Sequence, residues 1–136
     1  ALTVPAKASL SRVYSEKIDN ARVSRVAAVI EKCMGLKFSD QDIYINVAGG
    51  IKLTESAIDA ALCASLYSAR TGISFPEKTA VVGELSLAGE IRAVSKLKQR
   101  IKNATSLGFS TVITPEKEDS SIAVTDVKQM IKKLFG

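Results

Sequence analysis

The sequence predicts a mixed α/β domain of about four helices and five strands. Residues 42–48 alternate apolar and polar side chains as a strand does, whereas residues 23–34 and 57–67 carry apolar side chains as buried helices do. The length of 136 residues suits a single domain with one core of ordinary size. Hydrophobic residues make up 46% of the chain and charged residues 24%, which indicates a globular domain and excludes a disordered tail.

Residues 1–15 are predicted to form a linker or a short leading strand, ahead of a domain at residues 16–136. The opening contains Pro5 and scattered small residues, and strand-like composition is confined to residues 8–14. Such a segment is typical of a chain that arrives from another domain.

The first helix is predicted to begin after Asp19 or Asn20, either of which can cap its first turn. Gly35 is a natural end for it, because glycine adopts the left-handed conformation that closes many helices. The apolar positions that define its buried face are Val23, Val26, Ala27, Ile30 and Met34.

The clearest strand of the chain, residues 42–48, leads directly into its most apolar helix, residues 55–70. A bend is expected between them at Gly49-Gly50, because glycine adopts conformations that other side chains forbid. The helix has almost no polar face, and Asp59 is the one charge near its start. We therefore expect it to pack inside the domain.

The second half of the chain continues the mixed pattern. Residues 79–87 and 90–94 are predicted to pair as a hairpin. Ser95 is predicted to cap a helix that Gly108 ends. The remaining elements are a strand at 109–114, a polar loop at 116–121, a brief strand at 122–124 and a terminal helix at 126–135.

The composition favours some partners and disfavours others. A net charge of +5 and a pI near 9.3 favour polyanions. Aromatic residues are only 5% and Trp is absent, so a base-stacking platform for single strands is poorly supplied. Histidine is absent too, which removes the usual triad base and the commonest zinc ligand. Cys33 and Cys63 fall in predicted helices, where reduced and mostly buried thiols are expected.

Membrane and nucleotide sites are not expected in this chain. No apolar run approaches the roughly 20 residues that span a bilayer, and Ala1 begins no signal-peptide pattern. The sequence therefore predicts a cytoplasmic protein with no membrane partner. Gly49-Gly50 needs only to bend the backbone, because no Gly-x-x-x-x-Gly-Lys-Ser/Thr phosphate loop occurs.

Five positive charges gather within eleven residues where the predicted hairpin enters the next helix. Cations on one exposed surface can contact phosphates without reading base sequence, and their affinity falls as salt rises. The alternative is an ordinary solvated helix face. The candidate DNA-binding residues are Arg92, Lys96, Lys98, Arg100 and Lys102.

Six short blocks of sequence, spread over residues 20 to 115, carry a resemblance to a known family. The blocks are residues 31–36, 40–42, 49–59, 83–92, 99–104 and 107–109. The third block begins with Gly49-Gly50, and the fourth contains Gly83-Glu84 and Gly89-Glu90. In this order they resemble the carboxy-terminal domain of the bacterial DNA-repair family RadA, also called Sms. That domain in turn resembles the protease domain of Lon, so the resemblance implies the Lon-protease-domain fold, which is also called ribosomal protein S5 domain 2-like.

The resemblance implies a role without covalent chemistry. In the RadA family this domain helps to build a hexameric ring and to bind single-stranded or branched DNA, while an upstream ATPase drives branch migration in recombination and repair. ATP, Mg and Zn sites belong to the upstream domains, so no cofactor is expected in this fragment. The recombinase RecA is implied as a partner through the parent protein.

A peptidase of the Lon type is the alternative function. Lon-type proteases use a serine nucleophile and a lysine base, and the resemblance places Ser56 and Lys98 at those positions. A buried lysine can accept the hydroxyl proton when burial lowers its pKa. Against this, Glu55 and Ile58 stand where the proteases have small residues. Ser56 and Lys98 therefore either form a catalytic dyad or have no catalytic role, with Ser56 a residue at the start of a helix and Lys98 a solvated charge.

Overall fold

The computed structural model describes residues 1–136 and contains four α-helices and eight short strands. The helices are α1 (Asn20–Met34), α2 (Asp59–Thr71), α3 (Leu97–Ser106) and α4 (Val127–Phe135), and short 3-10 turns are η1 (Ala48–Gly50) and η2 (Ser56–Ile58). The strands are β1 (Leu2–Pro5), β2 (Val13–Ser15), β3 (Gln41–Ile45), β4 (Thr79–Val81), β5 (Glu84–Leu85), β6 (Ile91–Arg92), β7 (Thr111–Thr114) and β8 (Ile122–Ala123). The predicted mixed α/β class and the four predicted helices are confirmed, while the strands are shorter and more numerous than expected.

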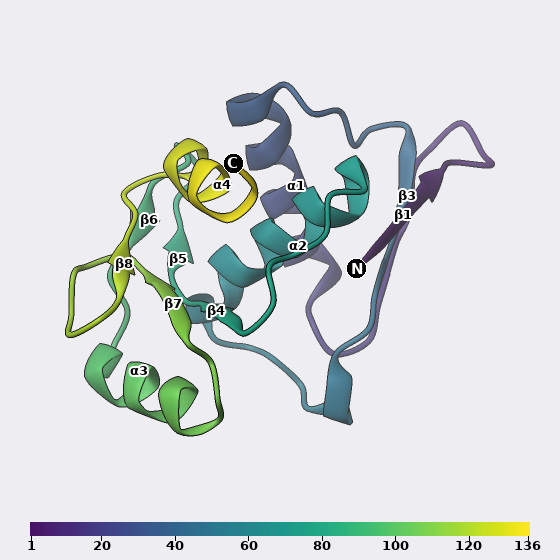
Figure 1. Ribbon diagram of the computed structural model, residues 1–136. Helices are drawn as coiled ribbons and strands as arrows, with labels where there is room; N and C mark the ends of the chain where they lie inside the picture. Colours follow the sequence, from purple (N-terminus) through teal and green to yellow (C-terminus); the bar gives the residue numbers. More distant parts are fainter.

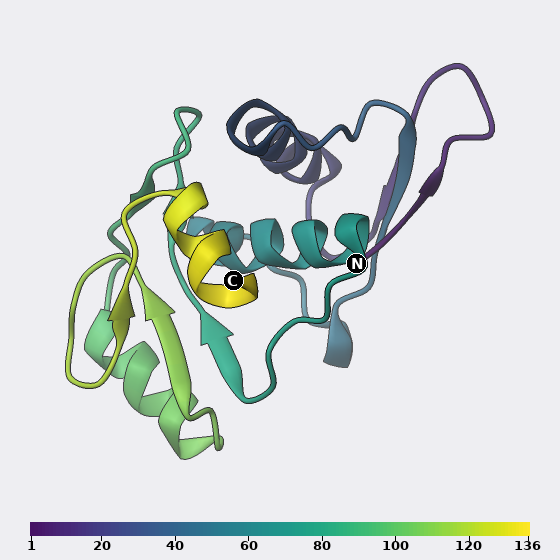
Figure 2. The same ribbon diagram turned by 45° about the horizontal axis from the view of Figure 1, so that its top comes forward.

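Helix α2 runs through the middle of the molecule and separates the sheets (Figures 1 and 2). The three-stranded sheet β1-β3-β2 lies on one side of it, and the sheet β4-β7-β8 and the pair β5-β6 lie on the other. Helices α1 and α4 both contact α2. The predicted burial of this helix is confirmed, since Ala60, Cys63 and Leu66 are fully enclosed.

Local capping fixes the ends of the outer helices. The side chain of Asp19 accepts a hydrogen bond from the Ala21 N–H at 3.3 Å, so the predicted cap of α1 is confirmed. Gly35 ends α1 in the left-handed conformation, as predicted. At α4, Asp126 accepts a hydrogen bond from the Gln129 N–H at 2.8 Å.

The N-terminal sheet places β3 between two strands from the first 15 residues. Strand β1 pairs antiparallel with β3, and β2 pairs parallel with it on the other side. Within the predicted linker or leading strand at residues 1–15, the strand placed at residues 8–14 forms only at its end, as β2, and a further strand, β1, forms at residues 2–5. Neither strand contains a buried residue, so they lack the apolar alternation that marks a half-buried strand in sequence.

The hairpin predicted over residues 79–94 is only partly right. Strand β4 pairs parallel with β7, and only β5 and β6 pair as the expected antiparallel hairpin. Strands β4 and β5 are separated at Gly83. A Cβ at this position would lie 2.6 Å from Cγ2 of Ile91 and 3.3 Å from Cβ of Ala60. Its backbone bonds to Ala57 and Ala60 instead of to a strand, because the chain crosses the start of α2 here.

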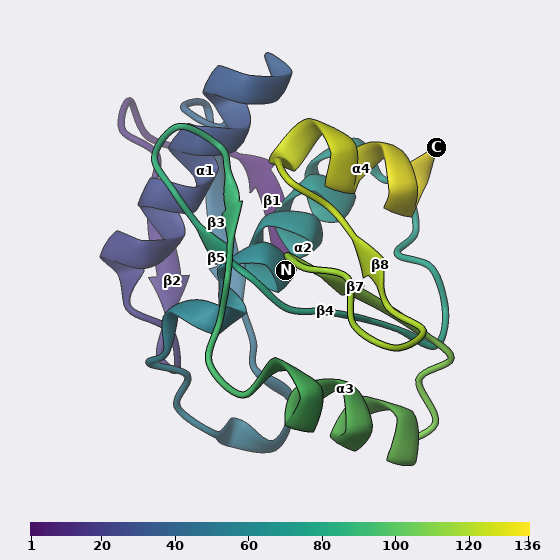
Figure 3. The same cartoon turned by 90° about the vertical axis from the view of Figure 1, so that its left-hand side faces the viewer.

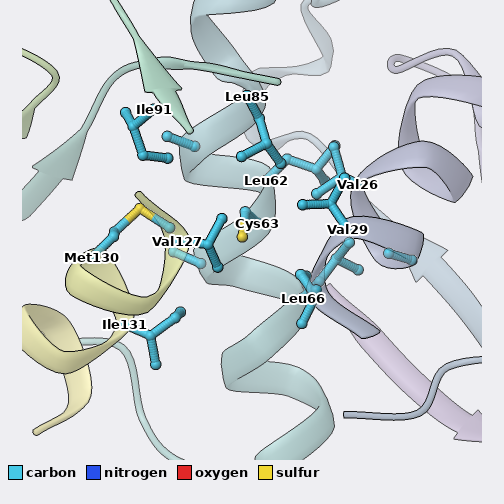
Figure 4. Close-up of a cluster of buried hydrophobic side chains, with 14 of the residues drawn as sticks. Val26, Val29, Leu62, Cys63, Leu66, Leu85, Ile91, Val127, Met130 and Ile131 are labelled. Atoms are coloured by element: carbon cyan, nitrogen blue, oxygen red, sulfur yellow. The ribbon is translucent and has the colours of Figure 1, made fainter. Parts of the chain in front are cut away.

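The core joins α1, α2 and α4 with the hairpin β5-β6 (Figure 4). The side chains that meet there are Val26, Val29, Leu62, Cys63, Leu66, Leu85, Ile91, Val127, Met130 and Ile131. Both cysteines are free thiols, as predicted, and burial raises the pKa of Cys63 to about 12. None of the helices has the length and apolar character needed to cross a membrane.

One buried ion pair holds the start of α2. Nη1 of Arg22 on α1 donates to Oδ1 of Asp59 at 2.6 Å, and the two side chains are 18% and 3% exposed. The other carboxylate oxygen of Asp59 accepts a hydrogen bond from the Leu85 N–H at 3.2 Å. Asp59 thereby connects α1, α2 and β5, and both of its oxygens have partners.

Replacing Arg22 by Met should destabilise the domain by about 3 kcal/mol, because it leaves the buried Asp59 carboxylate without its counter-charge. The free energy of unfolding in urea measures the loss. The matched control is Arg25→Met, which removes an exposed charge from the same helix. The double variant Arg22→Met with Asp59→Asn should recover part of the stability, since the amide is neutral and still accepts from Leu85. Equal stability of Arg22→Met and wild type would contradict this account.

Candidate nucleic-acid interface

Helix α3 is the most peripheral helix of the domain. It lies at the opposite side of the molecule from the N-terminal sheet (Figures 1 and 3). Ile101 is its only fully buried side chain. Ser95 does not cap it as predicted. Instead, Lys96 precedes the first turn with a left-handed backbone (φ 56°), and its side chain makes no capping bond.

Arg100, one of the five predicted DNA-binding cations, is engaged within the domain. Its Nη1 and Nη2 donate to the two carboxylate oxygens of Glu55 at 2.9 and 3.2 Å, and its Nε donates to the Ser95 carbonyl at 2.8 Å. A bidentate pair of this kind is the strongest arrangement that an arginine and a carboxylate form. The Arg100 side chain is only 27% exposed, so it ties α3 to the segment before α2.

The ion pair between Glu55 and Arg100 shifts the pKa values of both groups. Hydrogen bonds from Arg100 lower the pKa of the Glu55 carboxyl, and the bonds to Glu55 raise the pKa of the Arg100 guanidinium. In each case burial acts in the opposite direction and is outweighed. The charged form of both side chains is therefore favoured in the folded domain.

The other four predicted cations are exposed and loosely held. Nη2 of Arg92 lies 3.7 Å from the Glu90 carboxylate, and Nζ of Lys98 lies 4.0 Å from that of Glu118, with the Lys98 side chain 79% exposed. Lys96 and Lys102 are exposed and form no ion pair. These four side chains keep the freedom to contact a mobile anion.

A groove of about 410 Å³ runs between α3 and the loop that joins β7 to β8. Its lining residues are Lys98, Ile101, Lys102, Thr105, Ser106, Asp119 and Ser120. The loop is shaped by Ser121, whose hydroxyl accepts a hydrogen bond from the Glu118 N–H at 3.0 Å. Glu118 and Asp119 thus place negative charge opposite Lys98 and Lys102. The sequence predicted the polar loop but not that these two carboxylates face the lysines of α3.

Ser56 and Lys98, the two positions of the alternative peptidase, have separate partners. The Ser56 hydroxyl donates to Oε2 of Glu84 at 3.1 Å, and no hydrogen bond joins it to Lys98. Lys98 faces Glu118 and solvent. A lysine base needs a buried site next to its serine, and this arrangement provides neither burial nor contact.

Comparisons with known proteins place the domain in a family. Residues 9–118 match the family described as "Subunit ChlI of Mg-chelatase". The chain is 64% identical over 115 residues, 85% of its length, to "DNA repair protein RadA" of Treponema pallidum (strain Nichols), and covers 25% of that protein. It is also 39% identical over 139 residues to RadA of Rickettsia typhi (97% of the chain, 31% of that protein) and 36% identical over 145 residues to RadA of Streptococcus pneumoniae (100% and 34%).

The chain belongs to this ChlI domain family. Within it, the similarity to RadA over most of the chain confirms the predicted relationship to RadA proteins. The chain spans about a quarter to a third of the length of these relatives.

Arg100→Gln should lower the free energy of unfolding by about 0.5 kcal/mol near neutral pH, a value typical of a partly exposed ion pair. Because the pKa of Glu55 is lowered on folding, the pair stabilises the domain above the usual value of 4.5. That stabilisation is lost as the pH falls through the lower folded pKa. Urea denaturation at neutral pH and at a pH below both values measures the difference. An equal loss at the two pH values would contradict the role of the Glu55 carboxylate.

A serine-reactive probe should not label the folded protein, because the Ser56 hydroxyl donates to Glu84 and no lysine contacts it. Wild type and Ser56→Ala should behave alike when labelling is followed by mass spectrometry across a range of pH. Neither should degrade unfolded casein. Labelling of wild type that disappears in Ser56→Ala would establish the peptidase chemistry that this geometry disfavours.

Proposed function

We propose that this domain binds DNA phosphates through the exposed cations around α3. The observation that carries the proposal is the contrast between Arg100, which Glu55 holds in place, and four exposed cations with distant partners or none. The proposed contacts are Arg92, Lys96, Lys98 and Lys102, which we call the α3 rim. Mobile cations on one exposed rim give affinity without reading sequence. The name "DNA repair protein RadA" carried by the relatives supports a nucleic-acid ligand.

We infer further that the domain, residues 16–136, is an architectural part of a longer RadA-type protein with a Lon-protease-like scaffold. In this proposal the domain performs no covalent chemistry. It helps to form a cytoplasmic hexameric ring on single-stranded or branched DNA, and it holds no cofactor. An upstream ATPase with its own ATP, Mg and Zn sites drives branch migration, and RecA contacts the parent protein.

A ring would make a weak interface effective. A single copy of the domain, with three or four phosphate contacts, is expected to bind DNA weakly. The carboxylates of Glu118 and Asp119 across the groove reduce its affinity for DNA further. Several copies that face the same strand raise the overall affinity without new contacts, because each further contact becomes intramolecular. The modest charge of the α3 rim is therefore compatible with DNA binding by an assembly.

The double variant Lys96→Glu with Lys102→Glu should weaken DNA binding about tenfold in low salt, and the salt dependence of its affinity should become shallower. Fluorescence anisotropy with a labelled oligonucleotide at several salt concentrations measures both effects. Arg100 is left unchanged, because its loss would break the contact with Glu55.

The matched control carries Lys128→Glu with Lys132→Glu, the same charge change at exposed positions of α4. It should lose much less affinity than the α3 variant. Equal losses in the two variants would mean that net charge, and not the α3 rim, governs binding. A DNA affinity that changes neither with salt concentration nor with the α3 substitutions would refute the proposed function.

A further inference from the structure

An exposed apolar row crosses the outer face of the N-terminal sheet. Each strand contributes one member, since Leu2 pairs with Tyr44 in the register of β1 and β3, and Tyr14 pairs with Tyr44 in that of β2 and β3. Tyr14 and Tyr44 are 42% and 40% exposed, and Leu2 is more exposed still. The outer face of such a sheet is ordinarily polar, so this row requires a physical explanation.

The two tyrosine rings are stacked on each other. Their centroids lie 4.7 Å apart and their planes differ by 11°. One face of the Tyr14 ring therefore lies against Tyr44. Because β2 is an edge strand, no further strand covers the other face. Tyr44 supports the ring from behind, so Tyr14 presents a flat, rigid aromatic surface at the edge of the sheet.

The surroundings of Tyr14 offer polar and charged groups. A cavity of about 460 Å³ lies at the ends of β2 and β3, where Tyr14, Lys17, Asn20 and Asn46 are among the lining residues. Arg12, two residues before Tyr14 and just outside β2, is exposed, and its backbone N–H donates to Oδ1 of Asp42 at 2.8 Å. The cavity also contains one carboxylate, that of Glu16. The cavity beside Tyr14 is thus lined by one cation, one carboxylate and two amides, and the remaining lining is largely apolar or small.

We propose that Tyr14, supported by Tyr44, is a stacking site for an unpaired base of single-stranded nucleic acid. A base can continue the column of stacked rings, because every base has an aromatic face and such stacking tolerates any sequence. Lys17, which lines the same cavity, and the exposed Arg12 can complement the adjacent phosphates. The proposal rests on nucleic-acid binding by the domain, but it uses a surface distinct from α3 and requires bases instead of phosphates alone.

Tyrosine fluorescence offers a direct test, because the chain has three tyrosines and no tryptophan. Tyr67 packs against Phe135 in the interior, so Tyr67→Phe removes its emission and keeps the ring. In that background all emission comes from Tyr14 and Tyr44. The ligands are a thymidine oligonucleotide, an abasic oligonucleotide of the same length and a duplex. Stacking should quench the emission with the thymidine oligonucleotide and leave it nearly unchanged with the other two.

Tyr14→Ala should weaken binding of the thymidine oligonucleotide on the order of tenfold, as expected for the loss of one stacked base. Its affinity for the abasic oligonucleotide should not change. Tyr14→Phe should bind like wild type, since the ring is retained, and circular dichroism should verify that each variant is folded.

Three results would overturn the stacking site. The first is equal affinity of wild type and Tyr14→Ala for the thymidine oligonucleotide. The second is unchanged tyrosine emission up to about 1 mM oligonucleotide, which is beyond the usual range of non-specific affinity. The third is a Tyr14→Ala variant whose sole defect, in sedimentation, is weaker self-association, because the row would then be a contact between copies of the chain.

The two proposals can fail independently. If Lys96→Glu with Lys102→Glu weakens all three ligands equally and Tyr14→Ala changes nothing, the α3 interface stands and the stacking site falls. If binding of the thymidine oligonucleotide requires Tyr14 but is unchanged by the α3 substitutions, the stacking site stands and the α3 interface falls.

Discussion

The buried carboxylate of Asp59 is the constraint on which the centre of this domain depends. It stands in the first turn of α2, where the N–H groups of the helix favour negative charge. One oxygen binds Arg22 and the other binds the Leu85 N–H, so α1, α2 and β5 are fixed to one another at a single point. The hairpin can then cross α2 closely enough that only glycine fits at position 83.

The same constraint determines the surroundings of Ser56. Ser56 lies one turn before Asp59, and Glu84 lies next to the residue that Asp59 binds. Glu84 therefore reaches the Ser56 hydroxyl, while Glu55 turns outward to Arg100. Two carboxylates thus flank the serine, and Arg100 pairs with that of Glu55. These contacts join η2 to β5 and the segment before α2 to α3.

The sequence predicted the helices well because their buried faces are long and periodic. Asp19 and Gly35 predicted both ends of α1 from local chemistry alone. The strands were harder, because their limits depend on contacts between distant parts of the chain. Nothing near Gly83 in sequence reveals that Ile91 and Ala60 leave no room for a side chain there. Strand β1 is likewise defined by its pairing with β3 and not by its own composition.

The positions of candidate binding residues were also only partly predictable. The cluster of positive charges near α3 is visible in sequence, but the engagement of Arg100 is not, because its partner Glu55 lies 45 residues away. The stacked pair of Tyr14 and Tyr44 was missed for the same reason. A low aromatic content argued against a stacking surface, yet the sheet brings two of the three tyrosines together. Composition counts side chains, whereas binding depends on which of them become neighbours.

The shallow attachment of α3 has a dynamic consequence. A helix with one fully buried side chain, Ile101, needs little free energy to open while the rest of the domain stays folded. Its amide protons should therefore exchange with solvent sooner than those of α1 or α2. Any anion that bridges its lysines would slow that exchange, so occupancy of this rim and local unfolding are thermodynamically linked.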